Sequence, residues 1–94
     1  MNKINTDILA ESFLQAKTKK EMEVFLSSIL TPKERKELPK RLQIFTLLKK
    51  GIPQHKIAEK VGVGIATVTR GSMELQRGNI QKTAWWHSQT PLRD

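Results

Sequence analysis

The residues best suited to chemistry lie between Gln54 and Leu75. Short polar side chains and an arginine would share the exposed face of a helix there, and such side chains suit the base edges and phosphates of a DNA groove. Taken alone, each is more often an ordinary solvated helix position, but a common face favours the functional interpretation. The residues concerned are Ala66, Thr67, Thr69 and Arg70.

Two short helices separated by a tight turn would position these side chains. Gly62 stands where the chain must reverse, and a glycine relieves the positive φ of such a turn. The small Ala58 lets the helices cross closely, and Val68 fills the space between them. This spacing predicts a DNA-binding helix-turn-helix. The residues at helical spacing are Ile57, Ala58 and Val61 in the first helix and Ile65, Val68 and Ser72 in the second.

Positive charge is concentrated on and just before this stretch. Residues 1–30 carry four basic and four acidic side chains, residues 31–60 carry nine and three, and residues 61–94 carry four and two, which gives the net charge of +8. A polyanion is the expected partner of such a field. A solvated lysine-rich face would explain the charge alone, but the predicted motif favours DNA.

Length and composition limit the alternatives. A chain of 94 residues allows one domain, and an apolar share of 37% leaves a monomer marginal, so we expect a dimer. The absence of cysteine excludes disulfides and thiolate metal sites and suits a reducing cytosol. No apolar run reaches the roughly 20 residues of a membrane span, and no signal peptide is evident. We therefore expect a cytoplasmic protein without a membrane partner.

The first two predicted helices present more apolar surface than their surroundings can cover. The first spans residues 6–16, and the second begins at Thr18, which forms a capping box with Glu21. We expect this half to pack on another chain, with an intramolecular core as the alternative. The apolar stripes are Ile8, Leu9, Phe13 and Leu14, then Met22, Phe25, Leu26, Ile29 and Leu30.

A third helix is predicted from Thr31 to Lys50. Thr31 and Glu34 form a second capping box, Pro39 should bend the helix without breaking it, and Gly51 should end it. The inward positions are Leu38, Leu42, Phe45 and Leu48.

A last short helix is predicted over residues 80–87. It holds Trp85 and Trp86, which we interpret as structural, one packing on the core and the other partly exposed. The residues after His87 should fray.

An enzyme is not expected. His55 and His87 are isolated, and no nucleophile has a base at a plausible spacing. Gly62-x-Gly64 lacks the strand and the Gly-Lys-Ser/Thr ending of a phosphate loop, and no metal or cofactor site is expected. An RNA-binding protein is disfavoured because only five residues are aromatic and none lies in the basic motif.

Several segments together resemble the bacterial tryptophan repressor family. The resemblance covers about residues 29–85, and it implies an all-α, six-helix intertwined homodimer. Such a dimer binds L-tryptophan as corepressor and then palindromic double-stranded operator DNA, and it represses genes of tryptophan synthesis or uptake. The matching segments are Leu30-Thr31-Pro32-x-Glu34-Arg35, then Arg41 and Gly51, then the specific run from Gly62 to Ser72.

The resemblance also implies a division of the single domain and roles for individual residues. Residues 1–50 would form the dimer, residues 51–76 the helix-turn-helix, and residues 77–94 a C-terminal helix and tail. Arg41 and Arg70 would sandwich the indole ring, with Arg70 also binding the carboxylate. Thr31 and Gly71 are further ligand positions, although Thr31 would alternatively be only a helix cap. From the partner chain, the backbone carbonyls of Ser28 and Leu30 would receive the ligand amino group.

This sequence departs from the family pattern at the ligand site and on the DNA side. Glu74 stands where the family often has a serine near the ligand amino group, and its carboxylate would either pair with the ammonium or spoil the pocket. His55 and Ala58 replace basic residues that contact DNA, so operator preference would differ.

An ion pair with Glu37 is the alternative role of Arg41. The alternative function is a related helix-turn-helix regulator that does not respond to tryptophan. The operator-facing positions are Gln54, Gly62, Ile65, Ala66, Thr67, Thr69 and Arg70.

Overall fold

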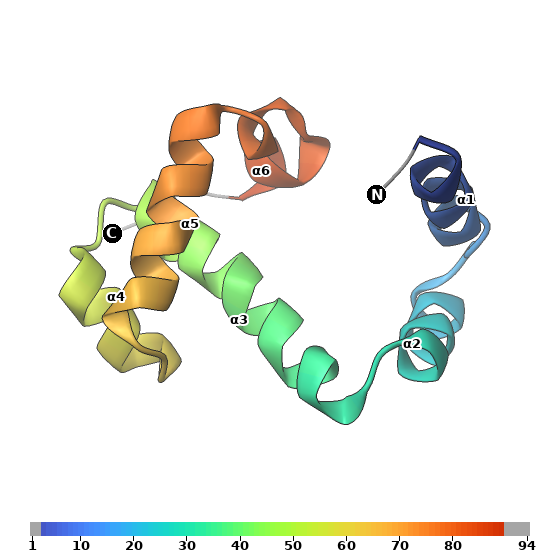
Figure 1. Cartoon of the computed structure of the whole chain (residues 1–94), viewed down its shortest axis with the longest axis horizontal. Coiled ribbons are helices and arrows are strands. Elements are labelled where there is room, and N and C mark those ends of the chain that lie inside the picture. Colours follow the sequence, from blue (N-terminus) through green and yellow to red (C-terminus); the bar gives the residue numbers. More distant parts are fainter. Residues whose placement is uncertain (1–2, 90–94) are drawn as a thin grey trace. The chain divides into compact units, whose positions relative to one another are not determined.

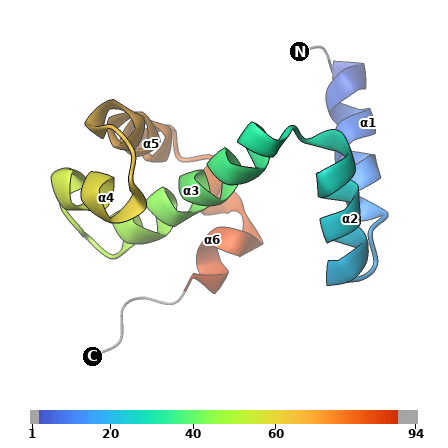
Figure 2. The ribbon, with the colours of Figure 1, turned by 90° about the horizontal axis from the view of Figure 1, so that it is seen from below.

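The computed structural model describes residues 3–89, and within this range every regular element is a helix (Figures 1 and 2). The predicted all-α class is confirmed. Each of these helices falls short of the length and apolar character that a membrane span requires. The chain forms two compact units, residues 1–36 and 37–94. The elements are α1 (Lys3–Leu14), α2 (Lys19–Ile29), α3 (Pro32–Lys49), α4 (Gln54–Val61), α5 (Ile65–Arg77), the 3-10 helix η1 (Ile80–Lys82) and α6 (Ala84–Ser88).

The first unit contains α1 and α2. α1 covers Lys3–Leu14 instead of the predicted residues 6–16, and it ends at Leu14 because the two amides that follow it bond to carbonyls only three residues back. α2 begins after Thr18, whose hydroxyl accepts a hydrogen bond from the Glu21 amide at 3.0 Å, as predicted. Phe13 and Phe25 meet edge to face, with ring centroids 5.4 Å apart. None of the described side chains of this unit is buried.

Both ends of α3 confirm the predicted signals. The Thr31 amide donates to Glu34 Oε1 at 2.9 Å, and the Glu34 amide donates to Thr31 Oγ1 at 3.2 Å, which is a reciprocal capping box. The helix continues through Pro39 without a break. After its last turn, Gly51 has a φ of +81°, and the Ile52 amide reaches back five residues to a helix carbonyl at 3.1 Å.

The second unit has a packed core, and the prediction of which α3 residues enter it was only partly right, because Leu48 packs against the core as predicted whereas Leu38 and Leu42 do not. Ile44 is 2% exposed, whereas Leu38 and Leu42, expected to point inward, are 38% and 45% exposed. Positions 42 and 44 lie about 200° apart around a helix, so only one of them can face α4 and α5. α3 therefore carries two apolar faces, of which this unit buries one. The core consists of Ile44, Ile57, Val61 and Val68, with Leu47, Leu48, Ile52, Ala58 and Val63 packed against it.

Helices α4 and α5 form at the predicted positions and lie side by side (Figure 1). Gly62 ends α4 with a φ of +79°, and the Val63 amide bonds back to the Ala58 carbonyl at 3.1 Å. Ile57 of α4 and Val68 of α5 are both fully buried. The glycine reversal and the buried valine thus fix how the two helices pack.

The C-terminal segment forms two short helices instead of the predicted one. Thr83 is extended, and its hydroxyl accepts from the Trp86 amide at 3.2 Å, so η1 ends and α6 begins there. Both tryptophans are half-buried, so the expected difference between them is absent. Lys49 Nζ lies 4.8 Å from the Trp86 ring centroid and donates to the carbonyls of Trp86 and Gln89. Gln89 is therefore held on α3, so the fraying predicted after His87 is wrong for Ser88 and Gln89, while residues 90–94 lie outside the described residues.

Candidate functional site

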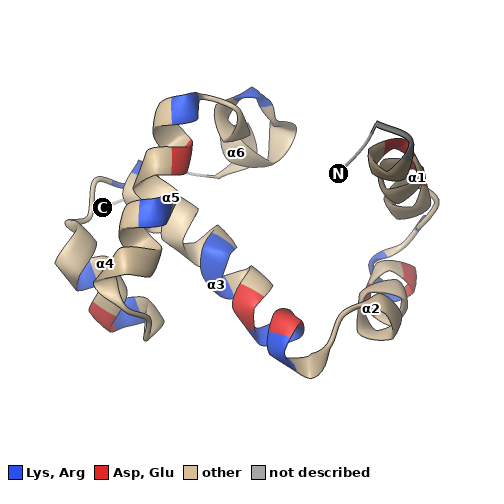
Figure 3. Ribbon diagram, viewed as in Figure 1, with Lys and Arg blue, Asp and Glu red and all other residues tan. Residues whose placement is uncertain are grey.

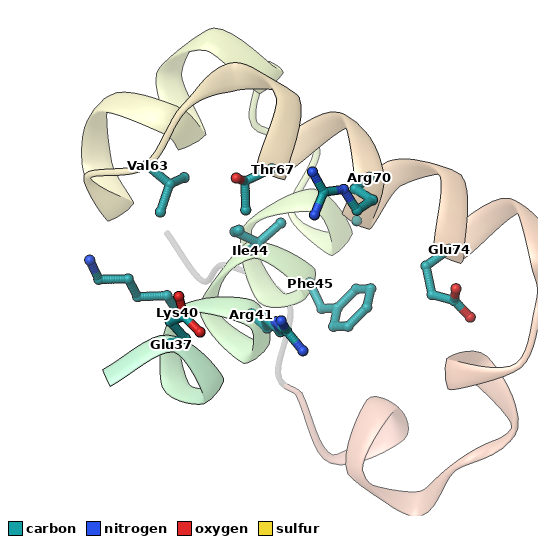
Figure 4. A pocket seen from close by; sticks show the side chains of 10 residues that line it. Glu37, Lys40, Arg41, Ile44, Phe45, Val63, Thr67, Arg70 and Glu74 are labelled. Atoms are coloured by element: carbon teal, nitrogen blue, oxygen red, sulfur yellow. The ribbon is translucent and has the colours of Figure 1, made fainter. Parts of the chain in front are cut away.

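A cavity of about 570 Å³ lies between the second half of α3 and α5, inside the second unit (Figure 4). Small-molecule sites typically have volumes of roughly 300–1,000 Å³. Two stripes of side chains form the main walls of this cavity, and within each stripe the residues are three or four positions apart, which places them on one helix face. α3 contributes Glu37, Lys40, Arg41, Ile44 and Phe45, the turn contributes Val63, and α5 contributes Thr67, Arg70, Gly71 and Glu74.

Arg41 and Arg70 approach this cavity from opposite walls (Figure 4). Both are exposed, and within residues 3–89 neither side chain forms an ion pair or a hydrogen bond. The alternative role of Arg41, an ion pair with Glu37, is therefore not formed. A guanidinium plane stacks on aromatic rings and binds a carboxylate through parallel hydrogen bonds. The two arginines are thus suited to a planar aromatic acid.

Glu74 places a carboxylate at the same cavity. The residue is half-buried, and its Oε1 lies 3.8 Å from Nη1 of Arg77, one turn further along α5. The Arg77 side chain is 74% exposed, and such a long, solvated ion pair contributes little. The Glu74 carboxylate therefore remains available to a cationic group in the cavity.

Gly71 lies where α5 crosses α3. A Cβ at this position would come within 3.0 Å of Ile44 Cγ2 and 3.7 Å of Leu48 Cδ1. Because Ile44 is buried, it has little room to move aside. The glycine thus permits the close crossing of the two helices that forms the cavity.

The other three residues that the resemblance assigns to the ligand belong to the first unit, and the cavity forms without them. Ser28 Oγ donates to the Val24 carbonyl at 2.8 Å, Leu30 is half-buried, and Thr31 caps α3. The alternative role of Thr31 as a cap is therefore formed.

The cavity also includes residues that sequence reasoning did not assign. Lys40 and Phe45 lie on the α3 wall beside Arg41, and Val63 lies at one end of the cavity (Figure 4). The signal for Lys40 and Phe45 is their spacing from Arg41 along α3, which becomes interpretable only once Ile44 is known to face α5, whereas Val63 in the turn before α5 has no such signal.

The residues assigned to DNA lie on α4, the turn and α5, and basic residues are found on α3, α4 and α5 (Figure 3). The Thr69 hydroxyl donates to Gln54 Oε1 at 2.9 Å, which leaves the amide nitrogen of Gln54 free to donate. Neither Pro53 nor Gly64 supplies a side-chain cap, so the first N–H groups of both helices are open to an anionic group. The exposed members of the assigned set are Gly62, Ile65, Ala66, Thr69 and Arg70.

Thr67 departs from the exposed face predicted for it. It is half-buried and lines the cavity, because it lies three and four residues before Arg70 and Gly71 and shares their face of α5. Arg70 is the member of the assigned DNA set that is both exposed and part of the cavity wall.

Comparisons with known proteins agree on one family. The family model described as Trp repressor protein matches residues 5–90. A Trp operon repressor homolog of Photobacterium profundum is 42% identical over 80 residues, which cover 84% of this chain and 74% of that protein. The homolog of Vibrio atlanticus is 42% identical over 67 residues (70% and 68%), and that of Vibrio campbellii is 47% identical over 55 residues (57% and 55%). No solved structure matches the chain.

Proposed function

This chain belongs to the Trp repressor family, and from that membership we propose that it represses transcription by binding operator DNA with L-tryptophan as corepressor. The family is regulatory, so the protein is a regulator and not an enzyme. Its targets would be genes of tryptophan synthesis or uptake, and its operator a palindrome in double-stranded DNA. It would act in the cytoplasm.

The observation that supports this proposal most directly is that α5 contributes both to the proposed DNA-binding face and to the wall of the cavity. One face of the helix exposes Ile65, Ala66 and Thr69, and the other lines the cavity with Thr67 and Arg70. A ligand in the cavity contacts the helix that would enter the major groove. It shifts the protein toward DNA binding to the extent that it binds the DNA-competent arrangement of α3 and α5 more tightly.

In the ligand site, the planes of Arg41 and Arg70 would enclose the indole ring, and Arg70 would bind the carboxylate. Their lack of ion-pair partners within residues 3–89 supports this role. Ser28 and Leu30 of a second copy would contribute backbone carbonyls, and Thr31 would border the site while capping α3.

A homodimer is part of the proposal. α1, α2 and the outer face of α3 expose Ile8 (59%), Leu14 (82%), Val24 (56%) and Leu42 (45%), which a second copy would cover. A two-fold dimer would present two recognition helices to successive major grooves, about 34 Å apart. That spacing is general for helix-turn-helix dimers, and the tryptophan repressor is among the examples from which it is known.

The presence of Glu74 in the cavity wall favours one alternative. If its carboxylate excludes the amino acid, the protein would be a helix-turn-helix regulator that binds DNA without responding to tryptophan.

The test is fluorescence anisotropy of a labelled operator palindrome from tryptophan synthesis genes, titrated with the protein with and without L-tryptophan. We expect at least about tenfold tighter binding with the ligand, a coupling of about 1.4 kcal/mol. Equal affinity in both conditions would support the tryptophan-independent alternative.

Substitution of Arg70 tests the ligand site directly. Arg70→Ala should abolish the ligand response while leaving the helical content unchanged in circular dichroism, because the side chain is exposed and unpaired. Arg77→Ala, which removes an arginine of α5 outside the cavity, is the matched control and should retain the response. An unchanged response in Arg70→Ala would contradict the assignment.

A further inference from the structure

The α5 wall of the cavity carries opposite charges one turn apart. Arg70 and Glu74 are four residues apart and both line the cavity, as does Gly71 between them. Four residues correspond to about 6 Å along a helix. A ligand that carries an ammonium and a carboxylate on one carbon, as an α-amino acid does, can therefore engage both side chains, the carboxylate with Arg70 and the ammonium with Glu74.

The carboxylate of Glu74 has no strong partner of its own. Its ion pair with Arg77 spans 3.8 Å, and the two side chains are 41% and 74% exposed. A ligand that covers Glu74 without offering a cation would remove water from a charged group, which is unfavourable. A bound carboxylate near Arg70 would also repel it.

We propose that Glu74 is a specificity-determining residue that selects aromatic α-amino acids over aromatic acids that lack the ammonium group. This inference rests on the proposed ligand site. The other cavity carboxylate, Glu37, lies on α3, one turn before Arg41. Glu37 therefore lies on the opposite wall from Arg70, whereas Glu74 lies one turn from Arg70 on the same helix.

The test measures the affinity of the full chain for L-tryptophan and for indole-3-propionate, which differs by loss of the ammonium group, using isothermal titration calorimetry. The wild type should prefer L-tryptophan. Glu74→Gln should weaken tryptophan binding by about tenfold, the loss expected for a charge-assisted hydrogen bond, and should strengthen indole-3-propionate binding. A gain for one ligand with a loss for the other cannot come from a merely damaged fold.

Glu59→Gln provides the matched control, since it removes the same charge from an exposed position of α4 outside the cavity. It should leave both affinities unchanged, and Glu74→Ser should behave as Glu74→Gln does. If Glu74→Gln keeps the wild-type ratio, or if only Glu37→Gln changes it, the inference is overturned while the ligand site stands. If the wild type binds neither indole, the proposed ligand site fails and the inference fails with it.

Discussion

The two units of this chain use their apolar residues differently. The second unit buries Ile44, Ile57, Val61 and Val68 in a core formed by α3, α4 and α5. The first unit buries none of its described side chains and leaves Leu14 82% exposed. The comparison indicates that the cavity and the proposed DNA face rest on a core within one chain, whereas α1 and α2 leave their apolar side chains exposed, where the proposed second copy would cover them.

The largest expected effect tests the core of the second unit. Ile57→Ala should lower the free energy of unfolding by about 2–5 kcal/mol, because Ile57 is fully buried and its loss leaves a cavity. Urea denaturation followed by circular dichroism measures this. Ile65→Ala removes the same atoms from a residue that is 50% exposed and should cost below about 1 kcal/mol. Equal losses in the two variants would contradict the assigned core.

An intermediate effect is expected for a substitution on the exposed apolar face of α3, which tests whether that face forms the dimer interface. Leu42→Ser should weaken the proposed dimer by about 1–2 kcal/mol, because it removes apolar surface that a second copy would bury. Sedimentation velocity over a range of concentrations measures the dissociation constant. Met73→Ser, at a 59% exposed position of α5, is the control and should leave assembly unchanged. Indistinguishable dissociation constants for wild type and Leu42→Ser would remove α3 from the interface.

The smallest expected effect concerns positioning within the second unit. Thr69→Val removes the hydroxyl that donates to Gln54 Oε1 and should weaken operator binding about twofold to tenfold, the range of a single net hydrogen bond. Thr69→Ser keeps the hydroxyl and should bind more tightly than Thr69→Val in the same anisotropy assay. Equal affinities for Ser and Val at this position would show that the hydroxyl does not matter.

Helix limits were largely predictable because their signals are local. The capping box of Thr31 and Glu34 and the reversal at Gly62 depend on hydrogen bonds and backbone angles within a few residues. The split at Thr83 was not predicted, although its capping hydroxyl is equally local.

The candidate site was only partly accessible from the sequence. The resemblance pointed to Arg41, Arg70, Gly71 and Glu74, and the structure places all four around one cavity. Lys40 and Phe45 were not identified, because their contribution depends on which face of α3 meets α5, and Val63 was not identified because it lies in the turn before α5 and reaches the cavity only through the packing of the helices.

By itself, the sequence determined the helices, most of their ends and the concentration of positive charge before and within the α4–α5 segment. The tertiary structure decided that Ile44 and not Leu42 enters the core, and that Thr67 faces the cavity. The physical reason is that helix formation depends on neighbours along the chain, while burial depends on distant residues. Either apolar face of α3 satisfies the helix, and only packing against α4 and α5 selects one of them.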